Sequence, residues 1–390
     1  VVVVGHGYAG VCACRELAES GVRVALLERQ PEDTYMATGS ESMAINSKVL
    51  DRATEGNPIP HVDMNEYFEN WMTITGNQVN PALLMRFVKN EADNIDWYYD
   101  SLTDSDIATL SHSGSPAAGE TWPHLLPNIG PIKFYPGVIS AYAEECNQTK
   151  IQGYNREKAK AAGAEFFFNT RGLQILQDNG KVSGVIAENR ADGSYLKFSC
   201  KAVVVATGGF AYNEEMLNDL MPDIKNNMIE GEAWKDAFGN ERFVGDASNW
   251  QYQGDGIKMA HWAGAHLESI IPGMNAKHIQ APTSMNNFPQ AVWVRSDGKR
   301  FMNEFYPVVE QRGVPNVYLP REPISCVFDS NFPEYRQYTV PQHGMFSPTT
   351  SAIEELKTGM DKAYQKFKGT WVEPESSKED NQAGAMFAAP

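Results

Sequence analysis

The chain has 390 residues, a formal net charge of −16 and 42% hydrophobic residues, which is typical of a globular protein long enough for two domains. The acidic balance argues against nucleic acid or an anionic membrane surface as a partner, and no apolar run approaches the ~20 residues of a membrane helix. The five cysteines are scattered and fit neither a disulfide framework nor a zinc or C-x-x-C motif.

The first twenty-eight residues predict a strand, a tight turn, a helix and a second strand. Val1–Val4 is a β-branched run suited to a strand buried on both faces, and residues 11–20 have the periodicity of an amphipathic helix. Val22–Leu27 is a second apolar run, and it ends at Glu28. Residues 5–10 join the first strand to the helix, read Gly-His-Gly-Tyr-Ala-Gly and fit the pattern G-x-G-x-x-G.

This order of strand, glycines, helix and acid is typical of a dinucleotide-binding unit. Gly5 allows the tight turn, Gly7 lets the backbone approach a pyrophosphate, and Gly10 lets helix and strand pack closely. The amides at the helix start would hold the phosphates, and Glu28 would accept hydrogen bonds from an adenosine ribose. His6 is expected to be accommodated within the turn. An ordinary βαβ unit without a nucleotide is the alternative interpretation.

The sequence after Glu28 predicts loops and helices. A loop rich in small residues, Thr38–Asn46, could bring backbone amides against a cofactor or be an ordinary surface loop. Helices are expected at Asn65–Thr75 and Pro81–Asp100, and irregular structure at residues 101–130. A further helix is expected from Val138 to about Cys146.

The middle of the chain predicts one more helix, at Arg156–Ala162, and then a stretch rich in strands. Strands are expected at Glu165–Asn169, Gly172–Gln177, Val182–Asn189, Tyr195–Cys200 and Ala202–Ala206, and hairpin turns join the middle three into an antiparallel meander. Small residues, Thr207-Gly208-Gly209, follow the last strand, and Gly254-Asp255-Gly256 opens a helix at Ile257–Ala263. Both glycine segments suit close approach to a cofactor.

These landmarks resemble the FAD-dependent flavoproteins of the fumarate reductase/succinate dehydrogenase type, which include soluble fumarate reductases, urocanate reductase and 3-ketosteroid dehydrogenases. The resemblance rests on residues 1–10 with Glu28, on Val203–Phe210, on Gly254–Ala260 and on Asp297–Glu304. It implies a GR-type, Rossmann-like α/β FAD-binding domain (1–272) and an α+β capping domain (273–390) that closes a substrate over the flavin. The chain is expected to stop before the family's C-terminal return to the FAD domain.

The resemblance implies FAD as the cofactor, and the lack of a histidine in Thr38–Asn46 implies non-covalent binding. The loop from Ser40 to Asn46 would run along the pyrophosphate and the flavin, and Leu173 would meet the adenine through its backbone. The residues expected to contact FAD are Gly5, Gly7, Tyr8, Ala9, Gly10, Glu28, Arg29, Thr38, Ser40, Ser42, Met43, Asn46, Gly172, Leu173, Ala206, Thr207, Gly208, Gly254 and Asp255.

The chain departs from the fumarate-reducing members where they bind their dicarboxylate. Val308 stands at the position where those members have their catalytic arginine. Residues 280–283 read Gln-Ala-Pro-Thr and lack the histidine of the family's Gln-Ala-His-Pro-Thr segment. Tyr306 could donate a proton to the substrate or be a packed aromatic residue. His278 could donate a proton, anchor the substrate or be structural. Arg312 could supply a cation from a shifted loop or be simply exposed.

The sequence therefore predicts an FAD-dependent oxidoreductase acting on a C=C or CH–CH bond next to an electron-withdrawing group, with a small-molecule substrate other than fumarate. The alternatives are 3-ketosteroid-type dehydrogenation and a flavin-binding electron-transfer module without alkene chemistry of its own. The sequence has no haem attachment motif, so a separate electron donor or acceptor is expected. The sequence leaves the compartment undecided between cytoplasmic and exported. Because the sequence begins on a strand and without Met, we expect an upstream segment to be missing.

Overall fold

A computed structural model describes residues 1–112 without 38, 40, 57, 75, 76 and 78, and residues 137–210, 212–220 and 252–267. It also describes short stretches at 234–235, 241–242, 292–295, 297–300 and 325–327, and isolated positions between 329 and 370. The chain divides into two compact units. The first contains Val1–Ser42, Asp93–Ser111 and Ile139–Ile271, and the second contains Met43–Ala92, His112–Val138 and Pro272–Pro390. The predicted domain boundary at residue 272 stays a prediction.

A four-stranded parallel sheet forms the centre of the first unit. Its order is β10-β1-β2-β6, with β1 at Val2–Val4, β2 at Ala25–Leu27, β6 at Glu165–Phe167 and β10 at Val203–Val205. Val3 pairs with Val204 on one side and with Leu26 on the other. The central strand β1 is buried on both faces, as predicted for a valine run in a parallel sheet. The edge strands are less buried, and Val205 at the end of β10 is 38% exposed.

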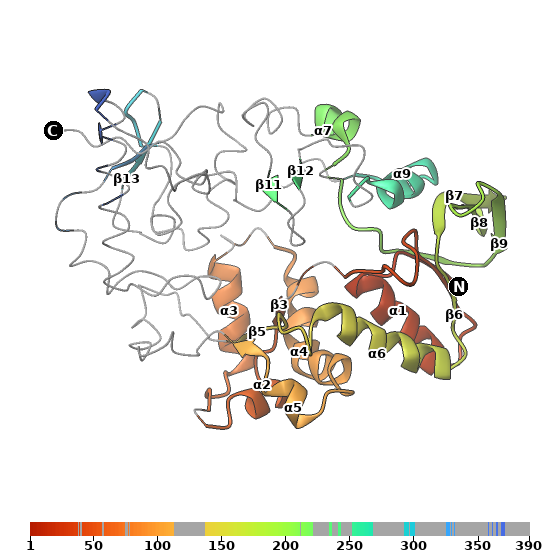
Figure 1. Ribbon diagram of the computed structural model, residues 1–390, viewed down its shortest axis with the longest axis horizontal. Helices are drawn as coiled ribbons and strands as arrows, with labels where there is room; N and C mark the ends of the chain where they lie inside the picture. The colour runs from red at the N-terminus through yellow and green to blue at the C-terminus, as the bar shows by residue number, and fades with distance from the viewer. Residues whose placement is uncertain are drawn as a thin grey trace. The chain divides into compact units, whose positions relative to one another are not determined.

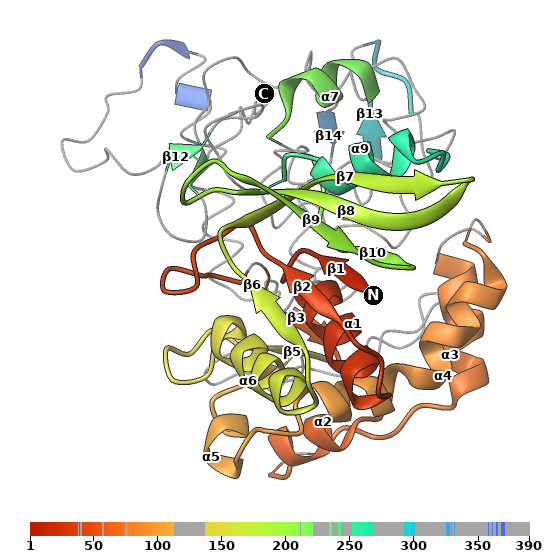
Figure 2. The ribbon, with the colours of Figure 1, turned by 90° about the vertical axis from the view of Figure 1, so that its right-hand side faces the viewer.

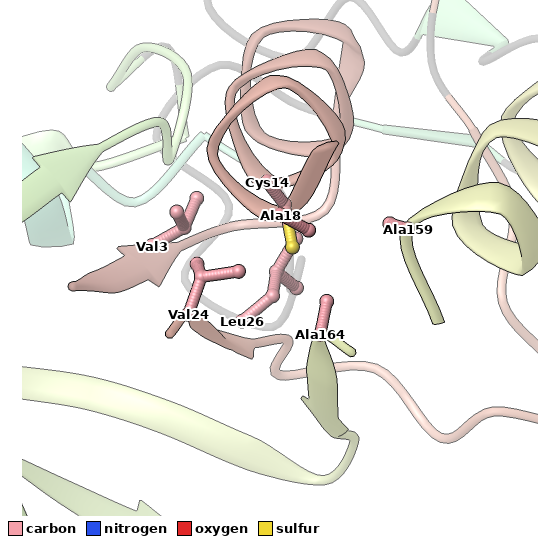
Figure 3. Packing of buried hydrophobic residues seen from close by; sticks show 7 residues of the cluster. All are labelled: Val3, Cys14, Ala18, Val24, Leu26, Ala159 and Ala164. Atoms are coloured by element: carbon pink, nitrogen blue, oxygen red, sulfur yellow. The ribbon is translucent and has the colours of Figure 1, made fainter. Parts of the chain in front are cut away.

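Two helices cover one face of this sheet. They are α1 (Tyr8–Glu19), which joins β1 to β2, and α6 (Gln148–Ala161), which precedes β6. Figure 3 shows the apolar cluster between helices and sheet, formed by Val3, Cys14, Ala18, Val24, Leu26, Ala159 and Ala164. Small side chains on both helices let their backbones approach the sheet closely.

An antiparallel meander and a further helix cover the opposite face. The meander consists of β7 (Thr170–Asp178), β8 (Lys181–Asn189) and β9 (Tyr195–Ser199), and the helix is α9 (Asp255–Trp262). Val2 and Val4 point toward this side and pack with Leu27, Val185, Ala187 and Met259. Alternate residues of β1 thus face the two layers. Figure 2 shows the meander on the side of the sheet opposite α1 and α6.

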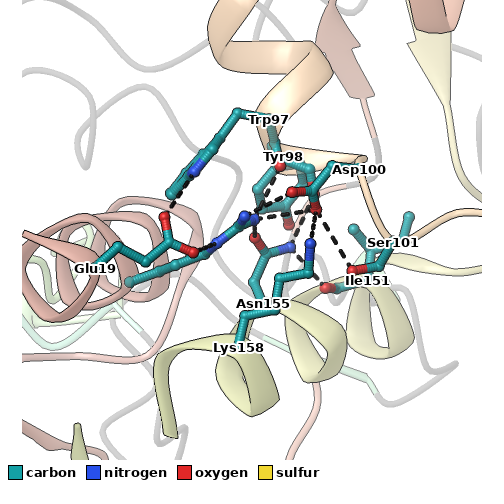
Figure 4. Close-up of polar contacts among 9 residues, drawn as sticks. Glu19, Trp97, Tyr98, Asp100, Ser101, Ile151, Asn155 and Lys158 are labelled. Atoms are coloured by element: carbon teal, nitrogen blue, oxygen red, sulfur yellow. Dashed lines mark hydrogen bonds and ion pairs between the residues drawn. The ribbon is translucent and has the colours of Figure 1, made fainter. Parts of the chain in front are cut away.

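A polar network anchored on the Arg15 side chain, which is 3% exposed, ties three helices of the first unit together. Its guanidinium donates to Glu19, to both carboxylate oxygens of Asp100, to Asn155 Oδ1 and to the Trp97 carbonyl. Asn155 in turn donates to the carbonyls of Tyr98 and Ile151, and the Lys158 ammonium lies 2.7 Å from Asp100 (Figure 4). The network joins α1, α6 and the end of α4 (Pro81–Tyr98).

The second unit contains a smaller helical cluster. Its helices are α2 (Lys48–Ala53), α3 (Met64–Ile74) and α4 (Pro81–Tyr98), the last of which belongs to this unit as far as Ala92. Ile45, Tyr67, Leu84 and Val88 form its buried core. The two helices predicted from periodicity near residues 65–75 and 81–100 are therefore confirmed.

The remaining described elements are short; Figure 1 labels them except β4 and β14, and Figure 2 labels β14. They are β3 (Glu41–Met43), α5 (Asp104–Ile107), β4 (Ser111–His112), β5 (Val138–Ser140), α7 (Glu214–Leu220), β11 (Trp234–Lys235), β12 (Glu241–Arg242), β13 (Val292–Val294) and β14 (Ser325–Val327). In the described part of the chain, no helix has the length and apolar character needed to cross a membrane.

The helix predicted from Val138 to Cys146 is wrong. Residues 138–140 form β5 instead, where Ile139 is fully buried. Two consecutive β-branched side chains, Val138 and Ile139, favour a strand, and the pairing with neighbouring strands decides against a helix. The helix predicted at Arg156–Ala162 is confirmed as the second half of α6, which begins earlier than predicted, at Gln148. Asn147 caps this start by accepting a hydrogen bond from the Lys150 amide.

The stretch from residue 101 is also less irregular than predicted. Thr103 and Asp106 form a capping box at the start of α5, in which each side chain accepts a hydrogen bond from the other residue's backbone amide. A short helix therefore begins there. The predicted small-residue loop likewise contains a strand, β3.

Candidate functional site

The glycine turn after β1 is closed by close packing of the backbone. Gly5 has φ of +102°, and its amide donates to the Leu27 carbonyl at 2.8 Å. A Cβ at Gly5 would lie 2.3 Å from the Ala206 carbonyl oxygen, and one at Gly10 would lie 1.8 Å from the Gly5 oxygen. Only glycine fits at these two positions, because any side chain would push α1 away from the sheet.

Gly7, in the same turn, is open. It stands at the N-cap of α1 with φ of −68° and ψ of −173°, and no side chain caps the helix there. A Cβ at Gly7 would meet no atom of the described residues within 4 Å. The first turn of the helix contains no acidic residue that would compensate its positive dipole end. The N-terminal amides and the dipole therefore suit a phosphate in the space beside Gly7.

Glu28 closes the turn from the end of β2. It is 6% exposed, and its carboxylate accepts hydrogen bonds from the amides of His6 and Gln30, both at 2.8 Å. Burial raises the pKa of Glu28, and these two hydrogen bonds act in the opposite direction. A carboxylate has about four acceptor positions, so this one keeps the capacity to accept from ribose hydroxyls.

His6 is accommodated in the turn by aromatic packing. Its ring is fully buried and lies edge-on to Tyr35 and Phe166, with centroid distances of 4.5 and 5.6 Å. Burial, with Arg156 and Lys160 nearby, lowers the pKa of His6 to about 3, so the ring is neutral. The Tyr35 hydroxyl donates to the His6 carbonyl at 2.7 Å, which fixes the backbone of the turn.

The second glycine segment lies beside the first. The Ala206 amide donates to the Val4 carbonyl at 2.8 Å, which places Thr207 and Gly208 directly after the sheet. Thr207 Oγ1 accepts from the Gly256 amide at 3.0 Å, and a Cβ at Gly256 would lie 2.3 Å from that oxygen. The Gly254 amide donates to Gly209. Segments 207–209 and 254–256 are thus brought together, as both were expected near the cofactor.

Asp255 has ion pairs that the sequence did not reveal. Its carboxylate lies 2.7 Å from the Arg171 guanidinium and 3.3 Å from that of Arg29, and its side chain is 11% exposed. Burial would raise the pKa of Asp255, but the hydrogen bonds and charges of its arginine partners outweigh it and hold that pKa below its usual range. The side chain ties α9 to β7 and to the end of β2. No local sequence pattern identifies Arg171 as the partner.

Several other predicted residues lie near the turn in the first unit. Tyr8 packs its ring near Gly39 and against Tyr98, at a centroid distance of 5.4 Å, and Ala9 is exposed. Ser42 Oγ lies 3.1 Å from the Tyr99 hydroxyl. Gly172 packs on Val4, where a Cβ would lie 2.6 Å from a valine methyl.

Leu173 stands at an irregularity of β7. The pairing with β8 shifts between Gly172 and Gln174, so Leu173 falls outside the regular register. The backbone of a residue at such a bulge is released from the ladder. This is the arrangement that backbone recognition of an adenine by Leu173 would use.

Met43 and Asn46 belong to the second unit. Met43 packs against the Ile45 cluster. Asn46 has φ of +62°, and its side chain both donates to the Val62 carbonyl and accepts from the Val62 amide, each at 2.8 Å. The Asn46 amide group is therefore used to hold the loop, which leaves the backbone as the part that can meet a cofactor.

The remaining candidates lie outside the described residues. They are Thr38, Ser40, His278, Tyr306, Val308, Arg312 and residues 280–283. Of the segment Asp297–Glu304, residues 297–300 are described, and Arg295 and Lys299 pair with Asp297 there. The catalytic hypotheses on Tyr306 and His278 stay predictions.

The sequence model of the FAD binding domain matches residues 1–315, a range that includes the glycine turn, Glu28 and both later glycine segments. The chain belongs to this family. The fumarate reductase (cytochrome) of Shewanella frigidimarina is 25% identical over 313 residues, which are 78% of this chain and 47% of that protein. The vinyl phenol reductase of Lactiplantibacillus plantarum is 22% identical over 78% of this chain and 56% of its own length.

A solved structure supports the fold of this FAD-binding chain. The 3-ketosteroid-Δ4-(5α)-dehydrogenase of Rhodococcus jostii RHA1, in complex with 4-androstene-3,17-dione, superposes with a TM-score of 0.55 and 16% identity, over 99% of this chain and 80% of that one. The predicted family, the FAD cofactor and the parallel α/β sheet are confirmed. The chain spans about half the length of the curated relatives it matches.

Gly7→Ala is expected to weaken FAD binding and leave the fold intact. The backbone at Gly7 suits alanine and its Cβ meets no protein atom, but the methyl group would occupy the space that a pyrophosphate needs. A fluorescence titration with FAD should show a dissociation constant raised about tenfold or more. The free energy of unfolding of the FAD-free protein should change by less than about 1 kcal/mol. An unchanged dissociation constant would mean that the pyrophosphate does not approach Gly7.

Proposed function

We propose that this chain is the flavin-bearing part of an oxidoreductase that reduces or forms a carbon–carbon double bond next to an electron-withdrawing or electron-delocalising group. The observation that carries the proposal is the helix start at Gly7, which no side chain caps. The neighbouring Gly5 and Gly10 are closely packed, Gly5 against Ala206, while the backbone at Gly7 leaves space for a ligand. It fits the pyrophosphate of FAD, the cofactor of the family to which the chain belongs.

The residues that would hold the cofactor divide by the part of FAD they meet. Gly5, Gly7, Gly10 and Glu28 would hold the ADP half, with the α1 amides on the phosphates. Thr38 and the Ser40–Asn46 loop would run along the pyrophosphate and the flavin, and Leu173 would meet the adenine. Residues 273–390 would form the capping domain over the substrate. When bound, FAD supplies hydride exchange at its N5 position.

The names of the relatives support the type of reaction. Fumarate, a vinyl phenol and 4-androstene-3,17-dione each contain a carbon–carbon double bond conjugated to a carbonyl group or an aromatic ring. Reduction of such a bond requires hydride at one carbon and a proton at the other, with hydrogen bonds or cations where negative charge develops. Tyr306 is our candidate for the proton donor, and His278 is the second.

The substrate we propose is not a small dicarboxylate. Fumarate carries two carboxylates, which are best held by arginines that bind in a bidentate manner. This chain has Val308 at the position of the expected arginine and no histidine in residues 280–283. A substrate with at most one carboxylate, such as an enoate, an enone or a vinyl phenol, needs fewer cations.

We expect the dithionite-reduced holoprotein to be reoxidised faster by such substrates than by fumarate. The measurement is anaerobic stopped-flow absorbance of the flavin, with a panel of fumarate, urocanate, cinnamate, 2-cyclohexenone, 4-vinylphenol and 4-androstene-3,17-dione. At least one compound other than fumarate should react about tenfold or more faster than fumarate, a difference of ~1.4 kcal/mol in activation free energy. Reduced free FAD at the same concentration is the control.

The other outcomes distinguish the alternatives. Rapid reoxidation by fumarate alone would contradict the substrate class. Oxidation of a 3-ketosteroid with an artificial electron acceptor, without reduction of any alkene, would favour dehydrogenation. A holoprotein that reacts with none of these compounds but exchanges electrons with small redox carriers would favour the electron-transfer module.

A further inference from the structure

Glu91 is a buried carboxylate that the proposed reaction does not use. It lies on α4, is 4% exposed and belongs to the second unit. Its Oε1 accepts a hydrogen bond from the Ile45 amide at 3.0 Å, and its Oε2 accepts one from the Tyr67 hydroxyl at 3.2 Å. It thus connects the segment Met43–Asn46 to α3 and α4.

The segment is held at three consecutive residues. The Ala44 amide donates to the Gly137 carbonyl at 2.6 Å, the Ile45 amide donates to Glu91, and the Asn46 side chain is bonded to Val62. Two of these anchors, the Gly137 backbone carbonyl and the Asn46 side chain, are uncharged. Glu91 supplies the third anchor from a group that ionises.

The surroundings of Glu91 are apolar. Ile45, Tyr67, Leu84 and Val88 form the buried cluster beside it. Tyr67 on α3 is the titratable group that faces it; Met43–Asn46 contributes uncharged residues, and the neighbouring turns of α4 contribute Phe87, Val88, Asn94 and Ile95. Within the described part of the chain, no lysine, arginine or histidine forms an ion pair with Glu91.

We propose that Glu91 is a positioning residue for the flavin-contacting segment Met43–Asn46, and that its ionisation sets how tightly the Ile45 amide is held. This inference rests on the proposed function, which assigns the Ser40–Asn46 loop to the pyrophosphate and the flavin. Hydrogen bonds to a carboxylate are roughly twice as strong as those to a neutral acceptor, so the segment is held more firmly when Glu91 is charged.

The ionisation takes place in an accessible pH range. Burial raises the pKa of Glu91 to about 7, although the hydrogen bonds from Ile45 and Tyr67 oppose this. A carboxyl group with a raised pKa contributes most to folding stability below its ordinary pKa, and loses that contribution as pH rises through about 7. Rising pH therefore lowers the stability of this unit while it strengthens the bond to the Ile45 amide.

The test is a pH titration of the FAD holoprotein without substrate. The flavin absorbance band and the dissociation constant for FAD are measured between about pH 5.5 and 8.5, a range that brackets the pKa of Glu91. We expect the wild type to show one transition with its midpoint near the pKa of Glu91. Glu91→Gln cannot ionise; its Oε1 still accepts from the Ile45 amide, and its Nε2 donates to the Tyr67 hydroxyl oxygen in place of accepting from it. It should therefore bind FAD within about threefold of the wild type and lose the transition.

Three further variants complete the design. Glu91→Ala should raise the dissociation constant for FAD about tenfold, because the Ile45 amide loses its acceptor. Tyr67→Phe removes a donor to the carboxylate and should move the midpoint to higher pH. Asp93→Asn removes the same charge from an exposed position of α4 and should leave the transition unchanged.

A wild type without a transition, a transition that persists in Glu91→Gln, or one that disappears in Asp93→Asn would overturn the inference. If Glu91→Gln does not fold, the midpoint in Tyr67→Phe decides, and an unshifted midpoint counts against Glu91. These readouts require bound FAD but no substrate. Failure of the proposed alkene chemistry would therefore appear only in the reoxidation panel, and leave this titration interpretable.

Discussion

Gly10→Ala is expected to open the glycine turn and yield protein that does not retain FAD. The added methyl group would lie 1.8 Å from the Gly5 carbonyl oxygen and 3.4 Å from the Ala206 Cβ, so α1 must move away from β1. Overpacking of this kind costs up to about 3 kcal/mol. The displaced helix start would no longer direct its amides at the pyrophosphate. Absorbance of the purified protein in the flavin bands and thermal unfolding measure the two effects.

Gly153→Ala is the matched control. Gly153 also lies in a helix of the same unit, α6, but a Cβ there meets nothing within 4 Å. This variant should bind FAD normally and gain about 0.5–1 kcal/mol of stability, because alanine favours a helix. If Gly10→Ala bound FAD and unfolded like Gly153→Ala, the close packing in the turn would have no energetic significance.

Arg15→Met is expected to be the most destabilising charge removal in the first unit. The Arg15 side chain is 3% exposed and donates to Glu19, Asp100, Asn155 and the Trp97 carbonyl. Methionine fills a similar volume but leaves these acceptors without their donor. Removing one partner of a buried ion pair lowers the free energy of unfolding by about 3 kcal/mol. For a domain of about 150–250 residues this lowers Tm by roughly 6–12 °C, measurable by thermal unfolding.

Lys158→Met is the matched control, because Lys158 lies 2.7 Å from the same Asp100 carboxylate but its side chain is 37% exposed. Solvent screens this pair, and its loss should cost less than about 1 kcal/mol. Equal losses for the two variants would show that burial of the Arg15 guanidinium adds nothing. The network in Figure 4 would then be incidental to stability.

Much of the first unit follows from local sequence patterns. The valine run before Gly5 and the run that ends at Ala206 form parallel strands, and the hairpin turns define the meander. The reason is that each pattern is short and that its physical cause lies within it. A β-branched run needs two buried faces, and Gly5 needs a positive φ.

The failed prediction at Val138–Cys146 has the opposite cause. Only Val138 and Ile139 at its start favour a strand, and pairing with strands distant in the chain determines its conformation. The anchors of the candidate site were missed for a similar reason. Arg171 reaches Asp255 from 84 positions away in the chain, and Glu91 reaches Ile45 from 46. No local pattern marks such partners.

The sequence alone determined that this chain has a dinucleotide turn and that the turn belongs to a parallel α/β sheet, since glycines and apolar runs act on their nearest neighbours. The choice of FAD as the dinucleotide came from the resemblance to a known family. Only the tertiary structure decided which atoms enclose the turn, such as the Ala206 carbonyl oxygen that leaves no room for a Cβ at Gly5. It also decided that Asp255 and Asn46 use their side chains to hold the protein, and that Glu91 is buried and forms no ion pair with a described lysine, arginine or histidine. These properties depend on which atoms of distant segments come within contact distance, and that is set by folding.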